Sequence, residues 1–178
     1  MCWQSKELLF LIRGYMTARL HPITIGFSTT NSWISKTIRW CSRSSVSHTY
    51  VRVPMRKKGV DLIFQAGIEV SIESAKRFES ENTIVKEFHF QVTEKKWQEF
   101  EQFAYDTLGA PYAYGKLIGM LWVLGCRAVG VKVKNPFGDG DHSYICVELV
   151  AKMLGLANTE EMTPQDLLDY LQTHPIEP

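Results

Sequence analysis

Apolar and polar residues alternate over the central part of the chain, which is the pattern expected of β-strands with one buried face. The alternation is clearest at residues 47–53, where His48, Tyr50 and Arg52 share one face and Thr49 lies with two valines on the other. The same pattern predicts four further strands, at residues 22–28, 60–66, 68–72 and 83–92.

Apolar residues at helical spacing predict helices on both sides of these strands. Residues 33–40 are predicted to form one such helix, in which Trp33, Ile34, Thr37, Ile38 and Cys41 share an apolar stripe and Asn31 and Ser32 offer an N-cap. A central group of strands between helices indicates an α+β fold. Further helices are predicted at residues 93–108, 112–129, 144–154 and from 163 onward.

The most apolar stretch is Leu117–Cys126, LIGMLWVLGC, which lies between a lysine and an arginine. Ten residues are too few for a helix to cross a hydrocarbon core of roughly 30 Å, so we expect a buried helix. Trp122 leaves a lipid-facing surface as the alternative, because tryptophan favours membrane interfaces. Near the N-terminus, the apolar run of residues 8–12 is too short for a secretory signal and predicts a cytoplasmic protein.

Composition and charge are those of an ordinary folded protein. The 178 residues are 45% apolar and 22% charged, and 20 basic residues balance 19 acidic ones. A chain of this length buries roughly 70% of its unfolded surface, which predicts a single domain over residues 1–178, with residues 1–20 as a candidate N-terminal extension. The formal net charge of +1 gives no support for a nucleic-acid partner.

Neither a cofactor nor a metal site has motif support. The glycine-rich phosphate-binding patterns are absent, and the four cysteines are too scattered for a disulfide scaffold or a zinc ribbon. Asp139, Asp141 and His142 lie close together, but Asp-Gly-Asp is common in turns and the spacing is not that of a calcium loop. We therefore expect no cofactor and no metal ligands.

Cys146 is the cysteine whose position favours catalysis. It stands near the start of the predicted helix over residues 144–154, after a glycine-rich loop. Free amide N–H groups at a helix N-terminus lower the pKa of a thiol and can also stabilise an oxyanion. The alternative is a small buried apolar residue, which is what most cysteines are and what we expect of Cys41 and Cys126.

His48 is the candidate base, because it opens a strand where its ring can face a cleft. If residues 56–59 close a hairpin, two residues that face each other across its strands have sequence numbers that add up to about 115. Because alternate residues of a strand point to the same side, His48 then lies on the same face of the hairpin as Gln65. Gln65 can accept a hydrogen bond from one ring nitrogen and so orient the other nitrogen toward the thiol. Glu69 is the rival orienting residue, and His142 is the rival base.

Two stretches of the chain resemble a known family. Residues 27–53, FSTTNSWISKTIRWCSRSSVSHTYVRV, resemble the opening of the circularly permuted, NlpC-like papain-fold proteins of the YiiX/YebB type. Those proteins begin with a strand, a helix with a basic, aromatic tail, and Ser-His at a strand start. Residues 144–154, YICVELVAKML, are similar to their second signature, a Cys-Ser-Glu-Leu-Val helix start.

The resemblance implies a papain-like fold with a central antiparallel sheet, and a cysteine-dependent hydrolase or acyltransferase. In the permuted order it implies His48 as the base, Gln65 as the orienting residue and Cys146 as the nucleophile. Val147 replaces the serine that usually follows the nucleophile, and Gln65 stands where relatives often carry a glutamate. The implied substrates are peptide-like amides first, then esters or thioesters, including lipid acyl groups.

Aromatic residues near the apolar helix and near Cys146 are candidates for a substrate groove. We expect Tyr112, Tyr114, Lys116 and Tyr144 to line it, with core packing of the aromatic rings as the alternative. Two other functions stay open, a non-catalytic binding module on the same fold and lipid-directed acyl transfer with residues 117–126 facing a membrane. The sequence indicates no oligomeric state.

Overall fold

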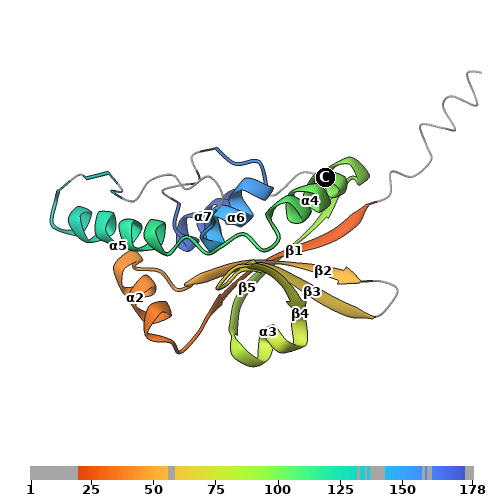
Figure 1. Ribbon diagram of the computed structural model, residues 1–178, viewed down its shortest axis with the longest axis horizontal. Helices are drawn as coiled ribbons and strands as arrows, with labels where there is room; N and C mark the ends of the chain where they lie inside the picture. Colours follow the sequence, from red (N-terminus) through yellow and green to blue (C-terminus); the bar gives the residue numbers. More distant parts are fainter. Residues whose placement is uncertain are drawn as a thin grey trace, which may run out of the picture.

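The computed structural model describes residues 20–55, 59–131, 133–134, 136, 143–157, 159 and 162–174. Its centre is a five-stranded sheet in the order β4-β3-β2-β1-β5, in which every neighbouring pair is antiparallel (Figure 1). All five predicted strands are confirmed, with ends that differ by no more than two residues. The strands are β1 (His21–Thr29), β2 (His48–Met55), β3 (Val60–Ala66), β4 (Val70–Ser74) and β5 (Thr83–Val92).

Six helices surround the sheet in the described part of the chain, which confirms the predicted α+β class. Helices α4, α6 and α7 cover one face, α3 covers the other, and α2 and α5 lie together at one end (Figure 1). The sequence pattern does not predict α3, because its seven residues hold one large apolar side chain, Phe78. The helices are α2 (Trp33–Ser42), α3 (Ala75–Glu81), α4 (Glu94–Thr107), α5 (Tyr114–Ala128), α6 (Cys146–Met153) and α7 (Pro164–Thr173).

The pairing of β2 with β3 has the predicted register. Val51 faces Phe64 and Val53 faces Leu62, and residues 56–58 of the predicted turn lie outside the described residues. Because alternate residues share a face, His48, Tyr50 and Gln65 are on the side of the sheet that α3 covers. This register places His48 and Gln65 diagonally across two neighbouring strands.

A small core lies under α3 and supports this end of the sheet. Tyr50 and Ile63 pack there against Phe78, with the Tyr50 and Phe78 ring centroids 4.5 Å apart. The Tyr50 ring also crosses Gly26 of β1 so closely that a Cβ at Gly26 would clash with it. Glycine is therefore required at this point of β1, and the larger core lies on the opposite face, under α4, α6 and α7.

Helices α5 and α6 both begin later than predicted. Tyr112 and Tyr144, each expected inside a helix, instead form a short parallel β-bridge. The N-cap residue Ile145 keeps an extended backbone, with φ −88° and ψ 157°, so α6 starts at Cys146. The bridge thus makes Cys146 the first residue of its helix.

The predicted burial of two helices is wrong in part. Trp33 belongs to the predicted apolar stripe of α2 but is 75% exposed, because α2 packs inward through Ser35 and Ile38. In α5, Leu117 is buried while Trp122 is 59% exposed, so that helix is buried on one side only. Among the described residues, no helix has the length and apolar character needed to cross a bilayer.

Candidate active site

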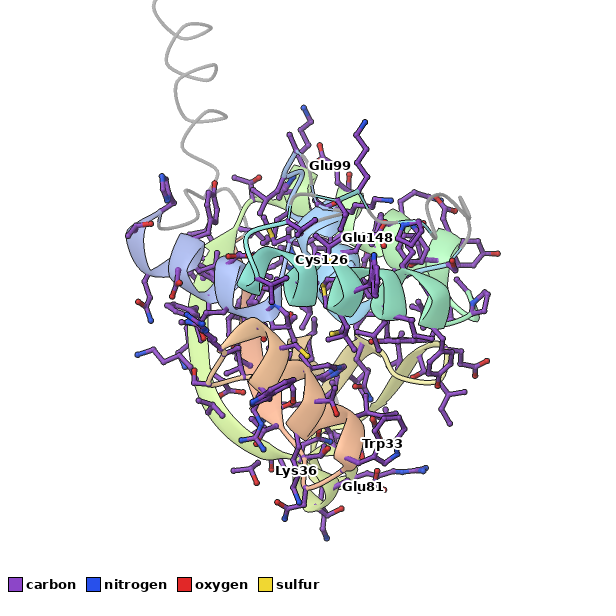
Figure 2. The ribbon with its side chains drawn as sticks, turned by 90° about the vertical axis from the view of Figure 1, so that its left-hand side faces the viewer. Trp33, Lys36, Glu81, Glu99, Cys126 and Glu148 are labelled. Atoms are coloured by element: carbon purple, nitrogen blue, oxygen red, sulfur yellow. The ribbon has the colours of Figure 1, made fainter. Side chains whose placement is uncertain are left out.

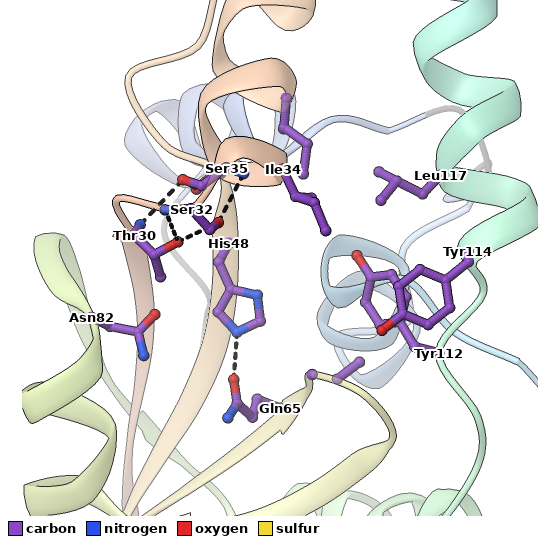
Figure 3. A pocket seen from close by; sticks show the side chains of 14 residues that line it. Thr30, Ser32, Ile34, Ser35, His48, Gln65, Asn82, Tyr112, Tyr114 and Leu117 are labelled. Atoms are coloured by element: carbon purple, nitrogen blue, oxygen red, sulfur yellow. Dashed lines mark hydrogen bonds between the residues drawn. The ribbon is translucent and has the colours of Figure 1, made fainter.

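The first residues of β2 and α6 meet at one end of the sheet. The Cys146 thiol is in hydrogen-bond contact with the His48 ring. The Nε2–H group of His48 donates a hydrogen bond of 2.6 Å to Oε1 of Gln65 (Figure 3). Since Nε2 is engaged by Gln65, the contact with the thiol falls to Nδ1. The structure therefore brings Cys146, His48 and Gln65 together in that order.

The surroundings of Cys146 favour its thiolate. Burial raises the pKa of the thiol, but the charge of the His48 ring and the hydrogen bond to that ring lower it. Hydrogen bonds from the backbone N–H groups of Thr49 and Val147 lower it further. The net pKa lies below the ordinary value of 9.0, so the thiolate persists at a lower pH than that of a free cysteine.

The pKa of His48 moves in the opposite direction. Burial lowers it, but the charge of Cys146, the hydrogen bonds to Cys146 and Gln65, and the charge of Glu73 raise it by more. The net pKa lies above the ordinary value of 6.5. Both shifts act in the direction that favours a thiolate–imidazolium pair over two neutral side chains.

Glu73 extends the group by one residue that the sequence reading missed. The Nε2–H₂ group of Gln65 donates a short hydrogen bond to Oε1 of Glu73, and Oε2 of Glu73 pairs with Arg77 Nε at 3.6 Å. This bond sets the orientation of the Gln65 amide, because its nitrogen faces Glu73 and its carbonyl oxygen faces His48. In the β3–β4 pairing Glu73 lies opposite Ile63, which makes it a diagonal neighbour of Gln65 on the same face.

Tyr112 lies against the candidate nucleophile. Its hydroxyl is in hydrogen-bond contact with the Cys146 sulfur and with the Cys146 backbone N–H. Burial, the charge of Cys146 and the charge of Tyr114 raise the pKa of Tyr112 well above its ordinary value of 10.0, so the hydroxyl keeps its proton. The Cys146 N–H thus donates to the Tyr112 oxygen, and the Tyr112 hydroxyl is a hydrogen-bond donor beside the sulfur.

A pocket of about 230 Å³ opens beside this group (Figure 3). His48, Gln65 and Tyr112 line it, whereas Cys146 is 4% exposed and lies behind them. One wall is polar and the other is apolar, from α2 and α5. The remaining lining residues are Thr30, Ser32, Ile34, Ser35, Ile38, Ser47, Ala66, Gly67, Asn82, Tyr114 and Leu117.

Two residues expected in the groove are elsewhere. The ring of Tyr144 packs edge-on against Phe103, with centroids 6.3 Å apart, and Tyr144 does not line the pocket. Lys116 turns inward from α5 and pairs with Glu148 of α6 at 3.2 Å. The β-bridge points Tyr144 away from the pocket, and the buried carboxylate of Glu148 draws Lys116 away from it.

Glu148 is a second charged residue that the sequence reading missed. It is fully buried in α6, two positions after Cys146, and also pairs with Lys152 at 2.8 Å. Through Lys116 it ties α5, which carries Tyr114, to the helix that carries Cys146.

The structure also distinguishes Gln65 from Glu69, the rival orienting residue. Glu69 is exposed, and its backbone forms a β-bridge with Pro111.

Asp139, Asp141 and His142 lie outside the described residues. Within the part of the chain that the structure describes, no three His, Cys, Asp or Glu side chains gather as a metal site.

Together, the fold and the site define an α+β protein with a hydrogen-bonded Cys-His-Gln group at the end of its sheet. No family model matches the sequence, and no curated protein matches it. The chain is similar in structure to the metalloprotein YiiX of Escherichia coli O157:H7, with 18% identical residues and a TM-score of 0.47. This similarity covers 85% of the present chain and 92% of the YiiX chain, so YiiX is a structural neighbour.

Proposed function

We propose that this chain is a cysteine-dependent hydrolase with a permuted, papain-like arrangement, which cleaves an amide or peptide-type bond. The observation that carries the proposal is the contact between the thiol at the first residue of α6 and a histidine whose other ring nitrogen is held by Gln65. Covalent catalysis requires a nucleophile, a base and a residue that orients the base, each hydrogen-bonded to the next.

In the first half of the reaction, the Cys146 thiolate attacks the substrate carbonyl carbon. A carbon–sulfur bond forms and the carbonyl electron pair moves to the oxygen. The tetrahedral species then collapses and the carbon–nitrogen bond breaks, while the Nδ1–H of the His48 imidazolium gives its proton to the leaving nitrogen. The amine departs and a thioacyl-enzyme remains.

The oxyanion of the tetrahedral species would lie next to the attacked carbon, within reach of donors that already surround the sulfur. These donors include the Tyr112 hydroxyl, which is held in place by the Cys146 backbone N–H. Donors fixed before the reaction stabilise the developing charge without reorganisation, and each contributes about 10²-fold or more to turnover. We therefore assign Tyr112 as an oxyanion donor.

In the second half, water releases the acyl group. Neutral His48 takes a proton from the water at Nδ1, the water oxygen bonds to the carbonyl carbon, and the carbon–sulfur bond breaks. The products are a carboxylic acid and the regenerated thiolate beside an imidazolium. Gln65 holds the Nε2–H throughout, so that Nδ1 stays directed at the reacting atoms.

Acylation by p-nitrophenyl acetate tests this proposal. We expect an initial burst of p-nitrophenolate and an acetyl group on Cys146, located by peptide mass spectrometry after an acid quench. The Cys146→Ala variant should show neither, and the matched variant Cys41→Ala should behave as the unaltered chain. Acetyl label spread evenly over Cys41, Cys126 and Cys146 would instead favour a non-catalytic binding module.

Lipid-directed acyl transfer is a second candidate function, and it would use the same chemistry. The observation that favours it is that exposed apolar side chains of α2 and α5 lie beside the pocket. In that reaction a lipid acyl ester or thioester would replace the amide, and the same residues would act. Comparing turnover of a soluble peptide amide with turnover of a vesicle-borne ester distinguishes the two.

A further inference from the structure

Helix α2 presents two tryptophans to solvent. Trp33 is 75% exposed and Trp40 is 82% exposed, on a helix whose inward side is formed by Ser35 and Ile38. Seven residues are about two turns, so both indoles lie on one face. Lys36 lies between them in the sequence and is also exposed, and Figure 2 shows it with Trp33 at the lower part of α2.

Helix α5 presents a second apolar face. Tyr114, Ile118 and Trp122 follow one another at intervals of four residues, and all three are exposed. Leu117 and Met120 lie on the opposite side of the helix and belong to the core. The outward face of α5 is therefore aromatic and apolar over two turns.

The two faces lie at the same end of the molecule. Helices α2 and α5 pack together and both lie at the front of Figure 2. The pocket beside His48 is lined by Ile34 of α2 and by Tyr114 and Leu117 of α5, so it lies between the two helices. We call this the α2–α5 surface, and its residues are Trp33, Lys36, Trp40, Arg43, Tyr114, Ile118 and Trp122.

The charge on the α2–α5 surface is positive. Lys36 and Arg43 are exposed, and neither α2 nor α5 contains an aspartate or a glutamate. Glu81 of α3 appears just below Trp33 in Figure 2, and it is paired with Arg77 at 3.7 Å. A ligand for this surface therefore meets indole rings and cations together.

We propose that the α2–α5 surface binds an anionic lipid membrane, with α2 and α5 lying against the interface. Indole rings favour the boundary between headgroups and acyl chains, and cations attract lipid phosphates. A helix with apolar and basic side chains on its outward face binds in the plane of the interface rather than across it. The pocket between the helices would then open toward the lipid.

Charge also makes a second copy of the chain a poor occupant. Two α2–α5 surfaces placed face to face would bring Lys36 and Arg43 against the same cations of the other copy. Like charges opposed at an interface oppose association, whereas anionic headgroups neutralise them. The proposal concerns binding alone and does not rest on the chemistry proposed for Cys146.

Vesicle flotation of the full chain tests the proposal. We expect flotation with vesicles of equal parts phosphatidylcholine and phosphatidylglycerol, and little flotation with phosphatidylcholine alone. Lys36→Gln with Arg43→Gln should lower the partition coefficient about 25-fold, since each cation near an anionic surface contributes about fivefold. Trp33→Ser with Trp40→Ser should lower it about tenfold or more.

Matched variants separate this surface from unspecific attraction. Tyr105 of α4 is an exposed aromatic outside the surface, and Lys76 of α3 is an exposed cation outside it. Tyr105→Ser and Lys76→Gln should float as the unaltered chain does, and so should Cys146→Ala. Equal flotation of the tryptophan variant and Tyr105→Ser would overturn the proposal. So would no flotation of the unaltered chain, or dimerisation through this face without lipid binding.

Discussion

The Nε2–H group of His48 donates a hydrogen bond to Oε1 of Gln65, and Gln65 in turn donates to Glu73. A neutral amide thus fixes the tautomer and the direction of the histidine ring, while the carboxylate of Glu73 is held one residue further away. Orientation and charge, which a single carboxylate would combine, are divided here between Gln65 and Glu73.

Removal of the orienting amide should cost less activity than removal of the base. We expect His48→Ala to lower kcat/KM about 10³-fold, because no group then transfers protons. Gln65→Ala should lower it about tenfold, because the ring keeps its contact with Cys146 but loses its fixed direction. Steady-state kinetics of both variants measure this, and equal losses would show that Gln65 does more than orient His48.

Loss of the charge at Glu73 should change the pH dependence. The carboxylate raises the pKa of His48, so Glu73→Gln should lower that pKa and move the alkaline limb of kcat/KM to lower pH. The loss at the optimum should be about threefold to tenfold. Glu81→Gln, an exposed glutamate of α3, is the control and should leave the profile in place. An unshifted limb in Glu73→Gln would mean that Glu73 only supports the fold.

The hydroxyl of Tyr112 should matter for acyl transfer more than for alkylation. Tyr112→Phe removes one oxyanion donor, and we expect turnover to fall about 10²-fold. Alkylation by iodoacetamide forms no oxyanion, so its rate at Cys146 should fall much less. Tyr114→Phe, whose ring lies 4.9 Å from that of Tyr112, is the matched control for a pocket tyrosine. If Tyr112→Phe lowered the rates of acyl transfer and of alkylation equally, Tyr112 would act by stabilising the thiolate instead.

The buried carboxylate of Glu148 should make stability depend on Lys116. Lys116→Met leaves Glu148 in the core with one fewer cation, and the free energy of unfolding should fall by about 2–3 kcal/mol. Lys152→Met removes a partner that is more exposed to solvent, and we expect a loss of less than about 1 kcal/mol. Urea denaturation measures both values, and a larger loss in Lys152→Met than in Lys116→Met would contradict the expectation that the less exposed lysine stabilises Glu148 more.

Sequence reasoning found the strands and the register because these follow from a period of two. Once β2 and β3 are joined by a short turn, parity alone puts His48 and Gln65 on one face. Glu73 was missed because the fourth strand was predicted to end at residue 72, one residue before it. A strand extended by two residues would have placed Glu73 diagonally from Gln65.

Burial and exposure of single side chains could not be predicted in the same way. Glu148 reads as an ordinary helical charge, and its burial depends on α5, which approaches from a distant part of the chain. Helical spacing likewise places Trp33 on the apolar stripe of α2, but it does not show which part of the stripe another element covers. The exposure of Trp33 could therefore be recognised only in the folded structure.

The pH dependence of alkylation at Cys146 tests the central claim most directly. Iodoacetamide is reacted with the chain across a pH series, and each cysteine is quantified by peptide mass spectrometry, with Cys41 and Cys126 as references. The lowered pKa predicts a midpoint for Cys146 below 9.0, and His48→Ala, checked for folding by circular dichroism, should move that midpoint upward. A midpoint at or above 9.0, or one that His48→Ala leaves unchanged, would contradict the proposed Cys146–His48 pair.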